Sequence, residues 1–183
     1  IDQGIALVPE DRRGTGILPN LSIRENMASV VPEGTVKMGF LRNSVINRIV
    51  EKYRNLFSIK MAGVNQSIVN LSGGNQQKVI IAKWLSREPR VLLLDEVSKG
   101  IDVGAKAEIY RLIRGLKQEG VAIVMVSSEI EEILAEADRT LVMWSGSVVS
   151  DVPRERMVRS ELMSLAMGVG SEPVSTSKEK VDG

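Results

Sequence analysis

Two adjacent acids, Asp95 and Glu96, close the short apolar run VLLLDE. The run predicts a strand that is buried on both faces of a parallel sheet, and ligands bind at the carboxyl ends of such strands. Because neighbouring strand residues point to opposite sides, Asp95 could hold a magnesium ion while Glu96 positions an attacking water. A plain strand end with solvent-facing acids fits the same residues.

A second group of residues suited to ligand binding lies upstream, in the stretch LSGGNQQ from Leu71 to Gln77. Two glycines let a ligand approach the main chain closely. The predicted helix from Asn75 to Ser86 would aim its free N–H groups and positive dipole end at a phosphate there. The alternative is an ordinary helix that Ser72 caps, with glycines that only make the bend.

Composition narrows the class of protein. The 183 residues are 43% hydrophobic and 26% charged, which is typical of a single soluble globular domain. With 24 basic and 23 acidic residues the net charge is +1, too small to attract nucleic acid without a specific site. Cysteine and histidine are absent, which excludes a thiol nucleophile, a cysteine zinc site and a histidine base. No apolar run approaches the ~20 residues that cross a bilayer, and no signal peptide is visible.

Apolar patterns predict an α/β chain around these two stretches. The run GIALV predicts a strand from Gly4 to Val8, and VAIVMV predicts another after Gly120. A helix is expected between VLLLD and VAIVMV, from about Val103 to Glu119. Strand, helix and strand in this order imply a right-handed crossover in a parallel sheet.

The segment from about Asn20 to Arg87 looks mainly helical. Ser22 and Glu25 have the spacing of a capping box for a short helix. A longer helix begins near Ser44, because apolar residues recur there on one helical face. That face consists of Ile46, Ile49, Val50, Tyr53, Leu56 and Phe57.

The last part of the chain predicts a helix, a hairpin and a closing helix. Ser128 and Glu131 have the spacing of a capping box for the helix SEIEEILAEA. The hairpin should turn at Ser145 and Gly146, and Pro153 should open the closing helix. The residues after Gly170 have little to bury and are expected to form a mobile tail.

Taken together, these stretches resemble the ATP-binding cassette (ABC) ATPases. LSGGNQQ is similar to the signature motif, and VLLLD to the Walker B strand. The further segments VPEDRR, GIDVGAK and VSSE resemble the carboxyl-terminal part of the second cassette in the tandem ATPase subunits that drive bacterial import of monosaccharides such as ribose, galactose and xylose. The resemblance implies an α/β fold with a P-loop NTPase-like parallel sheet flanked by helices, and a helical signature subdomain.

The same resemblance implies a division of the chain and a set of site residues. Residues 1–19 would hold a core strand and a Q-loop-like segment, 20–87 the helical subdomain, 88–170 the ATPase core, and 171–183 a disordered tail. Asp95 would bind Mg²⁺ and Glu96 would be catalytic. The signature residues, which would close over the ATP of a partner cassette, are Ser72, Gly73, Gly74, Asn75 and Gln76.

Other positions depart from the family pattern. Glu10 stands where the Q-loop glutamine is usual, and Ser128 stands at the switch position of a histidine, whereas Asp102 matches the D-loop aspartate. A serine hydroxyl is too short and too neutral to replace an imidazole, so capping is the preferred role of Ser128. Val97 replaces the usual proline after Glu96, which frees the backbone there.

The sequence contains no Gly-Lys pair, so it has no P-loop of the form G-x-x-x-x-G-K-[ST]. We interpret the chain, which begins at Ile1 inside a predicted strand, as part of a longer cassette. Alone it should bind ATP weakly or not at all, and it should not hydrolyse it. The missing P-loop strand should expose the edges of VLLLD and VAIVMV, which predicts a dimer or a domain-swapped assembly.

The resemblance implies ATP and Mg²⁺ as cofactors. The implied partners are another cassette, a transmembrane permease and, indirectly, a periplasmic sugar-binding protein, with the chain at the cytoplasmic face of the inner membrane. The permease would contact the loop at Glu10 and residues 20–66. Two alternatives remain: a non-catalytic regulatory or docking module of a transporter, and a soluble ABC ATPase of DNA repair or translation. Against the last, the chain lacks heptad coiled coils and zinc-binding cysteines.

Overall fold

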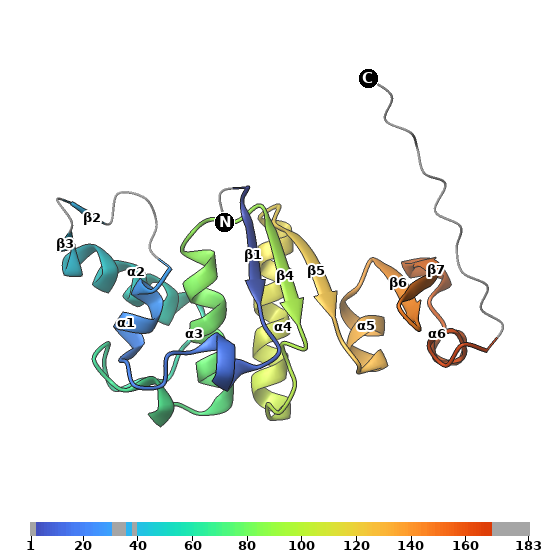
Figure 1. Cartoon of the computed structure of the whole chain (residues 1–183), viewed down its shortest axis with the longest axis horizontal. Coiled ribbons are helices and arrows are strands. Elements are labelled where there is room, and N and C mark those ends of the chain that lie inside the picture. Colours follow the sequence, from blue (N-terminus) through green and yellow to red (C-terminus); the bar gives the residue numbers. More distant parts are fainter. Residues whose placement is uncertain (1–2, 31–35, 38–39, 170–183) are drawn as a thin grey trace, which may run out of the picture. The chain divides into compact units, whose positions relative to one another are not determined.

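The computed structural model describes residues 3–30, 36–37 and 40–169 (Figure 1). The chain divides into two compact units, Ile1–Val126 and Ser127–Gly183. Each unit has its own apolar core. Among the described residues, none of the helices is long and apolar enough to span a membrane.

A three-stranded parallel sheet forms the centre of the first unit. Its strands are β1 (Ile5–Val8), β4 (Val91–Asp95) and β5 (Ala122–Val126), in the order β1-β4-β5. The predicted parallel sheet is therefore confirmed. Because β4 is paired on both sides, the prediction that the VLLLD edge is exposed is wrong; within the described residues, β1 and β5 are the edge strands of this sheet.

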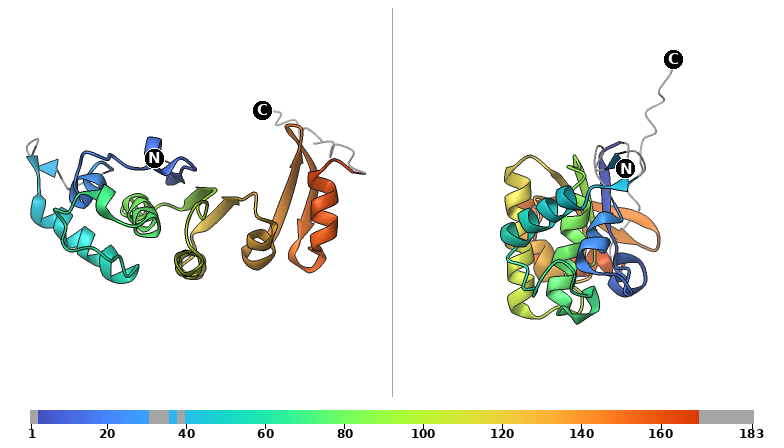
Figure 2. Two further views of the ribbon diagram at one scale, coloured as in Figure 1. Left: turned by 90° about the horizontal axis from the view of Figure 1, so that it is seen from below. Right: turned by 90° about the vertical axis from the view of Figure 1, so that its left-hand side faces the viewer.

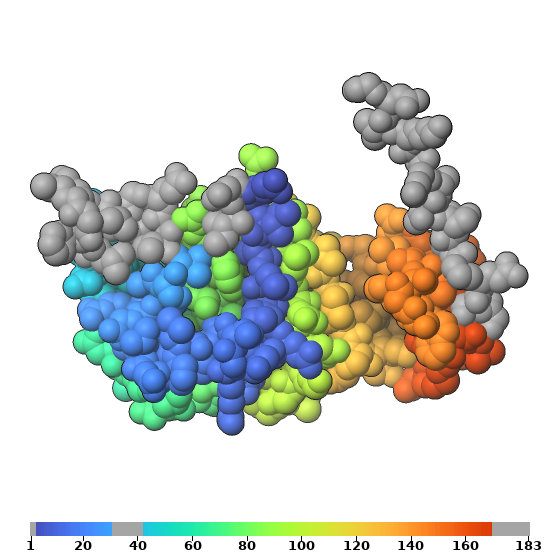
Figure 3. All heavy atoms as spheres, viewed as in Figure 1, coloured from blue at the N-terminus to red at the C-terminus, as the bar shows by residue number. Residues whose placement is uncertain are grey.

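Among the described residues, helices cover one face of this sheet more completely than the other. Two helices, α3 (Gly73–Leu85) and α4 (Val103–Gln118), lie on the same side of it (Figure 2). Val8, Leu92 and Leu94 point to that side and are at most 1% exposed. On the opposite face the exposed side chains are Ile5 (40%), Leu7 (47%), Val124 (53%) and Val126 (56%). Figure 3 shows atoms of β1 and β4 open on this face.

The expectation of strands buried on both faces is therefore wrong. Continuous apolar runs predict burial on two faces, but burial depends on what packs against each face. Within the described part of the first unit, the two helices α3 and α4 supply one cover only.

Most of the helices predicted between β1 and β4 are present. Helix α1 (Ile23–Ala28) carries the predicted capping box: the Ser22 N–H donates to Glu25 Oε2 at 2.8 Å and the Glu25 N–H donates to Ser22 Oγ at 3.2 Å. Helix α2 (Asn43–Leu56) buries Ile46, Val50 and Tyr53, but Leu56 is 59% exposed and does not join the inner face.

This segment is not entirely helical. Two short strands that the sequence did not predict, β2 (Val36–Lys37) and β3 (Phe40–Leu41), pair antiparallel.

The second unit contains α5 (Ile130–Glu136), β6 (Arg139–Trp144), β7 (Ser147–Pro153) and α6 (Arg159–Ala166). The hairpin turns at Ser145 and Gly146, with φ of 48° and 81°, as predicted. Pro153 does not open the closing helix, because a single 3₁₀ turn follows it and α6 begins only at Arg159. The predicted tail lies outside the described residues, since the description ends at residue 169.

Candidate functional site

Ser72 caps helix α3 and so defines the signature turn, Ser72–Gly74. Its hydroxyl accepts hydrogen bonds from the Asn75 N–H at 3.4 Å and from Asn75 Nδ2 at 2.9 Å. The helix starts at Gly73, two residues before the predicted start, so both glycines lie in its first turn. First-turn N–H groups have no acceptor within a helix, and they form a binding site for an anion.

Both glycines of this turn lie close to neighbouring side chains. A Cβ on Gly74 would lie 2.5 Å from the Cβ of Ala105, in the first turn of α4. A Cβ on Gly73 would lie 3.0 Å from Nη2 of Arg12. A side chain at position 74 would clash with the Ala105 Cβ, so glycine is needed there whether or not a ligand binds, whereas a side chain at position 73 would meet the flexible end of Arg12.

The next two signature residues lie differently. Asn75 Oδ1 accepts from the Lys60 N–H at 2.9 Å. The Gln76 side chain is buried at 6% exposure, and its Nε2 donates to the carbonyls of Ile68 and Leu71, both at 3.2 Å. Gln76 therefore holds the segment before the turn, and its predicted contact with nucleotide stays a prediction.

Asp95 and Glu96 lie at the end of β4, but their backbones differ. Strand β4 ends at Asp95, and Glu96 has a left-handed backbone with φ of 46°. The Glu96 N–H donates to the Val126 carbonyl at 3.0 Å, and the Glu96 carbonyl accepts from the Lys99 N–H at 3.0 Å. The expectation that Glu96 continues the strand and alternates with Asp95 is therefore wrong.

The buried residue Val97 permits this conformation. A residue that precedes proline is pushed towards extended conformations, so the usual proline would disfavour the left-handed backbone of Glu96. Val97 is 3% exposed and places no such restriction on Glu96.

Glu10 and Lys99 bring the Q-loop-like segment next to the end of β4. Glu10 Oε1 accepts from Lys99 Nζ at 2.6 Å. The hydrogen bond with Glu10, the charge of Glu10, and the charges of Glu96 and Asp95 all raise the pKa of Lys99. The ammonium group thus lies in the field of three predicted site residues. Both partners are exposed, so the pair adds little to stability.

The acids at the end of β4 fit a magnesium ion only as partial ligands. Mg²⁺ in nucleotide sites is commonly bound by one or two carboxylates together with phosphate oxygens and water. The described residues contain no group of three acids, histidines or cysteines that could hold a metal ion. Asp95 therefore suits a site in which a nucleotide supplies the other ligands.

Asp102 caps α4, since its Oδ1 accepts from the Ala105 N–H at 3.0 Å. Ala105 also packs against Gly74. The predicted D-loop aspartate therefore contacts a residue that itself touches the signature turn. The structure thus brings Asp102 and the turn together in the first unit.

Ser128, the predicted switch position, belongs to the second unit. Its predicted capping box with Glu131 is wrong, because α5 begins at Ile130 with Glu129 at the cap position. Glu131 instead pairs with Arg159 at 3.1 Å. The neighbouring Ser127 makes the local contact, accepting from the Glu129 N–H at 3.0 Å.

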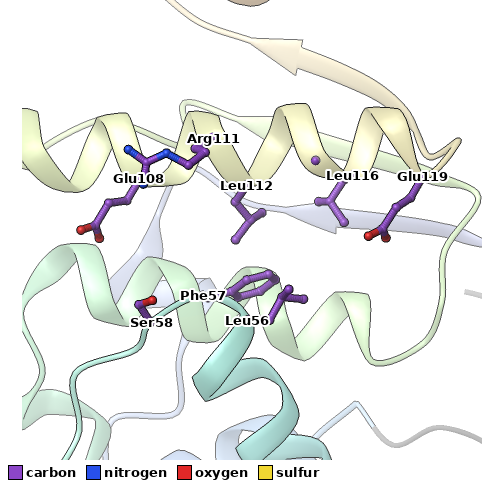
Figure 4. Close-up of a pocket in the computed structure, with 9 residues that line it drawn as sticks. Leu56, Phe57, Ser58, Glu108, Arg111, Leu112, Leu116 and Glu119 are labelled. Atoms are coloured by element: carbon purple, nitrogen blue, oxygen red, sulfur yellow. The ribbon is translucent and has the colours of Figure 1, made fainter.

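A cavity of about 250 Å³ lies away from the candidate residues, between the end of α2 and α4 (Figure 4). Phe57 and Leu112 line its apolar part, and Glu108, Arg111 and Glu119 surround it. Lys78 holds Glu108 by an ion pair, which lowers the pKa of that carboxyl. None of the predicted site residues lines this cavity.

Sequence reasoning missed two basic residues of the site. Lys99 reaches Glu10 across 89 residues of sequence. Arg12 lies against Gly73, and its Nε is buried without a hydrogen-bond partner among the described residues. The only local signals were the lysine after the two acids and the arginine pair after Glu10.

Residues 1–99 match the family model described as ABC transporter. The ribose import ATP-binding protein RbsA 2 of Streptomyces avermitilis is 44% identical over 170 residues, which are 90% of this chain and 33% of that protein. RbsA 2 of Rubrobacter xylanophilus is 39% identical over 180 residues, which are 98% of this chain and 35% of that protein. The chain spans about a third of the length of the curated relatives that it matches.

Among solved structures, the fold is similar to the ATP-binding cassette MJ0796 in a dimeric post-hydrolysis state bound to ADP and Pi. The TM-score is 0.67 at 21% identity, and the match covers 82% of this chain and 62% of that one. At this identity the likeness concerns the fold alone.

Proposed function

This chain belongs to the ABC transporter family, and from that premise we propose that it is part of the ATP-binding subunit of a sugar importer. Within that subunit it supplies the signature turn, the Walker B acids and the D-loop to ATP binding and hydrolysis. The observation that carries the proposal is the first turn of α3, where the exposed Ser72 and the half-buried Gly73 stand at the helix N-terminus and could donate to an anion. The relatives are named ribose import ATP-binding proteins, which supports a sugar as the transported substrate.

In the proposed mechanism, the signature turn binds a phosphate that is held mainly by another cassette. The Ser72 hydroxyl and the N–H groups of Gly73 and Gly74 donate to the terminal phosphate of ATP as negative charge develops on it. Donors fixed in a helix need no rearrangement at that moment. The packing of Gly74 on Ala105 keeps the turn in place.

Asp95 and Glu96 serve the nucleotide of this cassette. Asp95 would hold Mg²⁺ together with phosphate oxygens, and the ion would neutralise part of the phosphate charge. Glu96 would accept a hydrogen bond from the attacking water. Ser128 in place of the switch histidine and Glu10 in place of the loop glutamine favour binding and gating over rapid turnover at this nucleotide, which we call the second site.

The proposed partners follow from the relatives and the fold. The cassette MJ0796 is dimeric, and we infer that this chain likewise faces another cassette. As part of an import subunit it would bind a permease at the cytoplasmic face of the membrane, through the Glu10 loop and residues 20–66, and serve a sugar-binding protein indirectly.

The test compares two variants in the full-length protein that carries this chain. Ser72→Ala should reduce ATP hydrolysis by at least about tenfold, since it removes a donor to the developing charge. Glu96→Gln should slow hydrolysis at the second site only. The total rate should therefore fall less than in Ser72→Ala. Thermal unfolding of each variant controls for the lost helix cap.

Full hydrolysis in Ser72→Ala would contradict the signature role. Unchanged hydrolysis in Glu96→Gln would contradict the catalytic role of Glu96. If both variants behave like the unsubstituted protein, the alternative of a non-catalytic docking module is favoured.

A further inference from the structure

Arg12 lies directly beside the signature turn. Its guanidinium carbon and both Nη atoms lie 3.0–3.4 Å from the point where a Cβ on Gly73 would be. The guanidinium group therefore lies against Gly73, the first helical residue of α3. Gly73 is the residue that leaves room for it.

The backbone of Arg12 is fixed by its surroundings. Arg12 begins a short helical turn, Arg12–Gly16, which Asp11 caps by accepting from the Gly14 N–H at 2.8 Å. Gly16 at the end of the turn is buried, and its carbonyl accepts from the buried Lys83 Nζ at 2.8 Å. The backbone that carries the guanidinium is thus fixed by contacts within the chain.

The charge of Arg12 is not neutralised within the described residues. Its Nε is buried there without a hydrogen-bond partner, and no ion pair joins it to a described carboxylate. Burial, and then the charge of Arg13, lower the pKa of Arg12. The positive end of the α3 dipole lies beside it as well. A cation held among positive potentials, with part of its hydration lost, favours the arrival of an anion.

We propose that Arg12 is a phosphate-binding residue that donates to the terminal phosphate of the nucleoside triphosphate over which the signature turn closes. This inference rests on the proposed function, in which another cassette holds that triphosphate. A guanidinium offers several N–H donors in a planar fork that matches phosphate oxygens. Arg12 would thereby favour a triphosphate over a diphosphate, whose missing phosphate is the one it contacts.

The experiment uses the full-length protein that carries this chain, with three variants at the turn. Arg12→Gln removes the charge, Arg12→Lys keeps the charge without the fork, and Arg13→Gln is the matched control, since Arg13 is an exposed neighbour in the same turn. Calorimetry measures the affinity for the Mg²⁺ complexes of a non-hydrolysed ATP analogue and of ADP, and for inorganic phosphate. Thermal unfolding is followed without ligand.

Arg12→Gln should weaken binding of the ATP analogue by about tenfold, which corresponds to one charge-assisted hydrogen bond, and leave ADP binding unchanged. Arg12→Lys should weaken it less, and Arg13→Gln should have no effect. The ligand-free thermal midpoint of Arg12→Gln should stay the same or rise, because an unneutralised cation is removed. A purely packing role would lower that midpoint instead.

Equal losses in Arg12→Gln and Arg13→Gln would overturn the inference, because they would indicate a general charge effect. An equal loss of affinity for ADP would also overturn it. So would a loss of affinity for inorganic phosphate without a loss of affinity for the ATP analogue. Ser72→Ala separates this failure from a failure of the proposed function. If Ser72→Ala weakens binding of the analogue and Arg12→Gln does not, the signature role stands and the role of Arg12 falls.

Discussion

The two glycines of the signature turn face different neighbours, and Gly74 offers the sharper test of packing. Gly74→Ala would place a methyl group 2.5 Å from the Ala105 Cβ, and both atoms belong to helical first turns that cannot rotate away. We expect a loss of about 1–3 kcal/mol in the free energy of unfolding, as in other overpacked sites. Denaturant titration measures it.

The double variant Gly74→Ala with Ala105→Gly is the control. Removing the Ala105 methyl leaves the Ile101 Cγ2 as the nearest atom, at 3.4 Å. The double variant should therefore be more stable than Gly74→Ala alone, although a glycine in α4 costs about 1 kcal/mol. If the second substitution gives no recovery, close packing is not the reason for glycine at this position.

Glu96 combines a strained backbone with a proposed chemical role. Its φ of 46° is unfavourable for any residue with a Cβ, by about 1 kcal/mol. Glu96→Gly should therefore be more stable to denaturant than Glu96→Ala by about that amount, although both lack the carboxylate. The comparison between the two variants cancels the loss of side-chain contacts. Equal stability would mean that the left-handed backbone costs nothing.

Helix α2 carries a buried phenol whose titration should be visible at alkaline pH. Tyr53 is 5% exposed, and burial, followed by the charges of Glu88 and Glu119, raises its pKa to about 12. An unfolded tyrosine titrates near pH 10. Between these values the folded state keeps a proton that the unfolded state loses, so the contribution to stability is complete below pH ~10 and is lost as pH rises through about 12.

The variant Tyr53→Phe should remove this part of the pH dependence. Between pH ~10 and 12, the unfolding free energy of the unsubstituted chain should fall more steeply, by about 1 kcal/mol per pH unit. Urea titrations at several pH values measure both slopes, and the difference between them isolates Tyr53 from the lysines. Parallel slopes would show that the phenol is not shielded from water.

Elements with local signals were predictable from the sequence, and contacts between distant residues were not. The capping box at Ser22 and Glu25 and the apolar periodicity of α2 involve residues a few positions apart, and both are present. The Glu10–Lys99 pair and the contact of Arg12 with Gly73 depend on how β1, α3 and β4 pack, which no local pattern encodes. The uncovered face of the sheet could not be predicted for the same reason, since the sequence VAIVMV does not show whether another element packs against it.

Within the candidate site, residue types were easier to predict than backbone geometry. Asp95 at a strand end and Ser72 at a helix cap follow from simple rules, and both lie as predicted. Valine instead of proline at position 97 predicted only a freer backbone, and not the left-handed conformation of Glu96. The misplaced cap at Ser128 shows the limit of spacing rules where two serines are adjacent.

The arrangement of donors and acids in the first unit indicates parts of two different sites. The signature turn presents N–H donors and Arg12, which suit an incoming phosphate, whereas Asp95 and Glu96 present oxygens, which suit a metal ion and water. If the donors and the acids bound the same phosphate group, both would have to lie on one surface. In the proposed function, the donors and the acids each bind a different nucleotide. The proposed division of roles between two cassettes rests on this difference in ligand chemistry.

The apolar face of the sheet predicts how the 183-residue chain behaves on its own. Ile5 and Leu7 on β1 and Val124 and Val126 on β5 are each at least 40% exposed, and both strands lie at the edges of the described sheet. Exposed apolar strands at a sheet edge favour association with another copy. Light scattering over a concentration series should therefore show dimers or larger assemblies. A monomer at high concentration would contradict the prediction.

Two valine substitutions test whether this face drives the association. Val124→Lys places a charge on the apolar face, where Val124 of β5 pairs with Leu93 of β4, and should shift the chain towards monomer. Val103→Lys makes the same change at an isolated site, the first residue of α4, where the side chain is 84% exposed. It should leave the assembly unchanged, because a single exposed valine offers little area to a partner. An equal shift in both variants would mean that added charge, rather than loss of the apolar face, separates the copies.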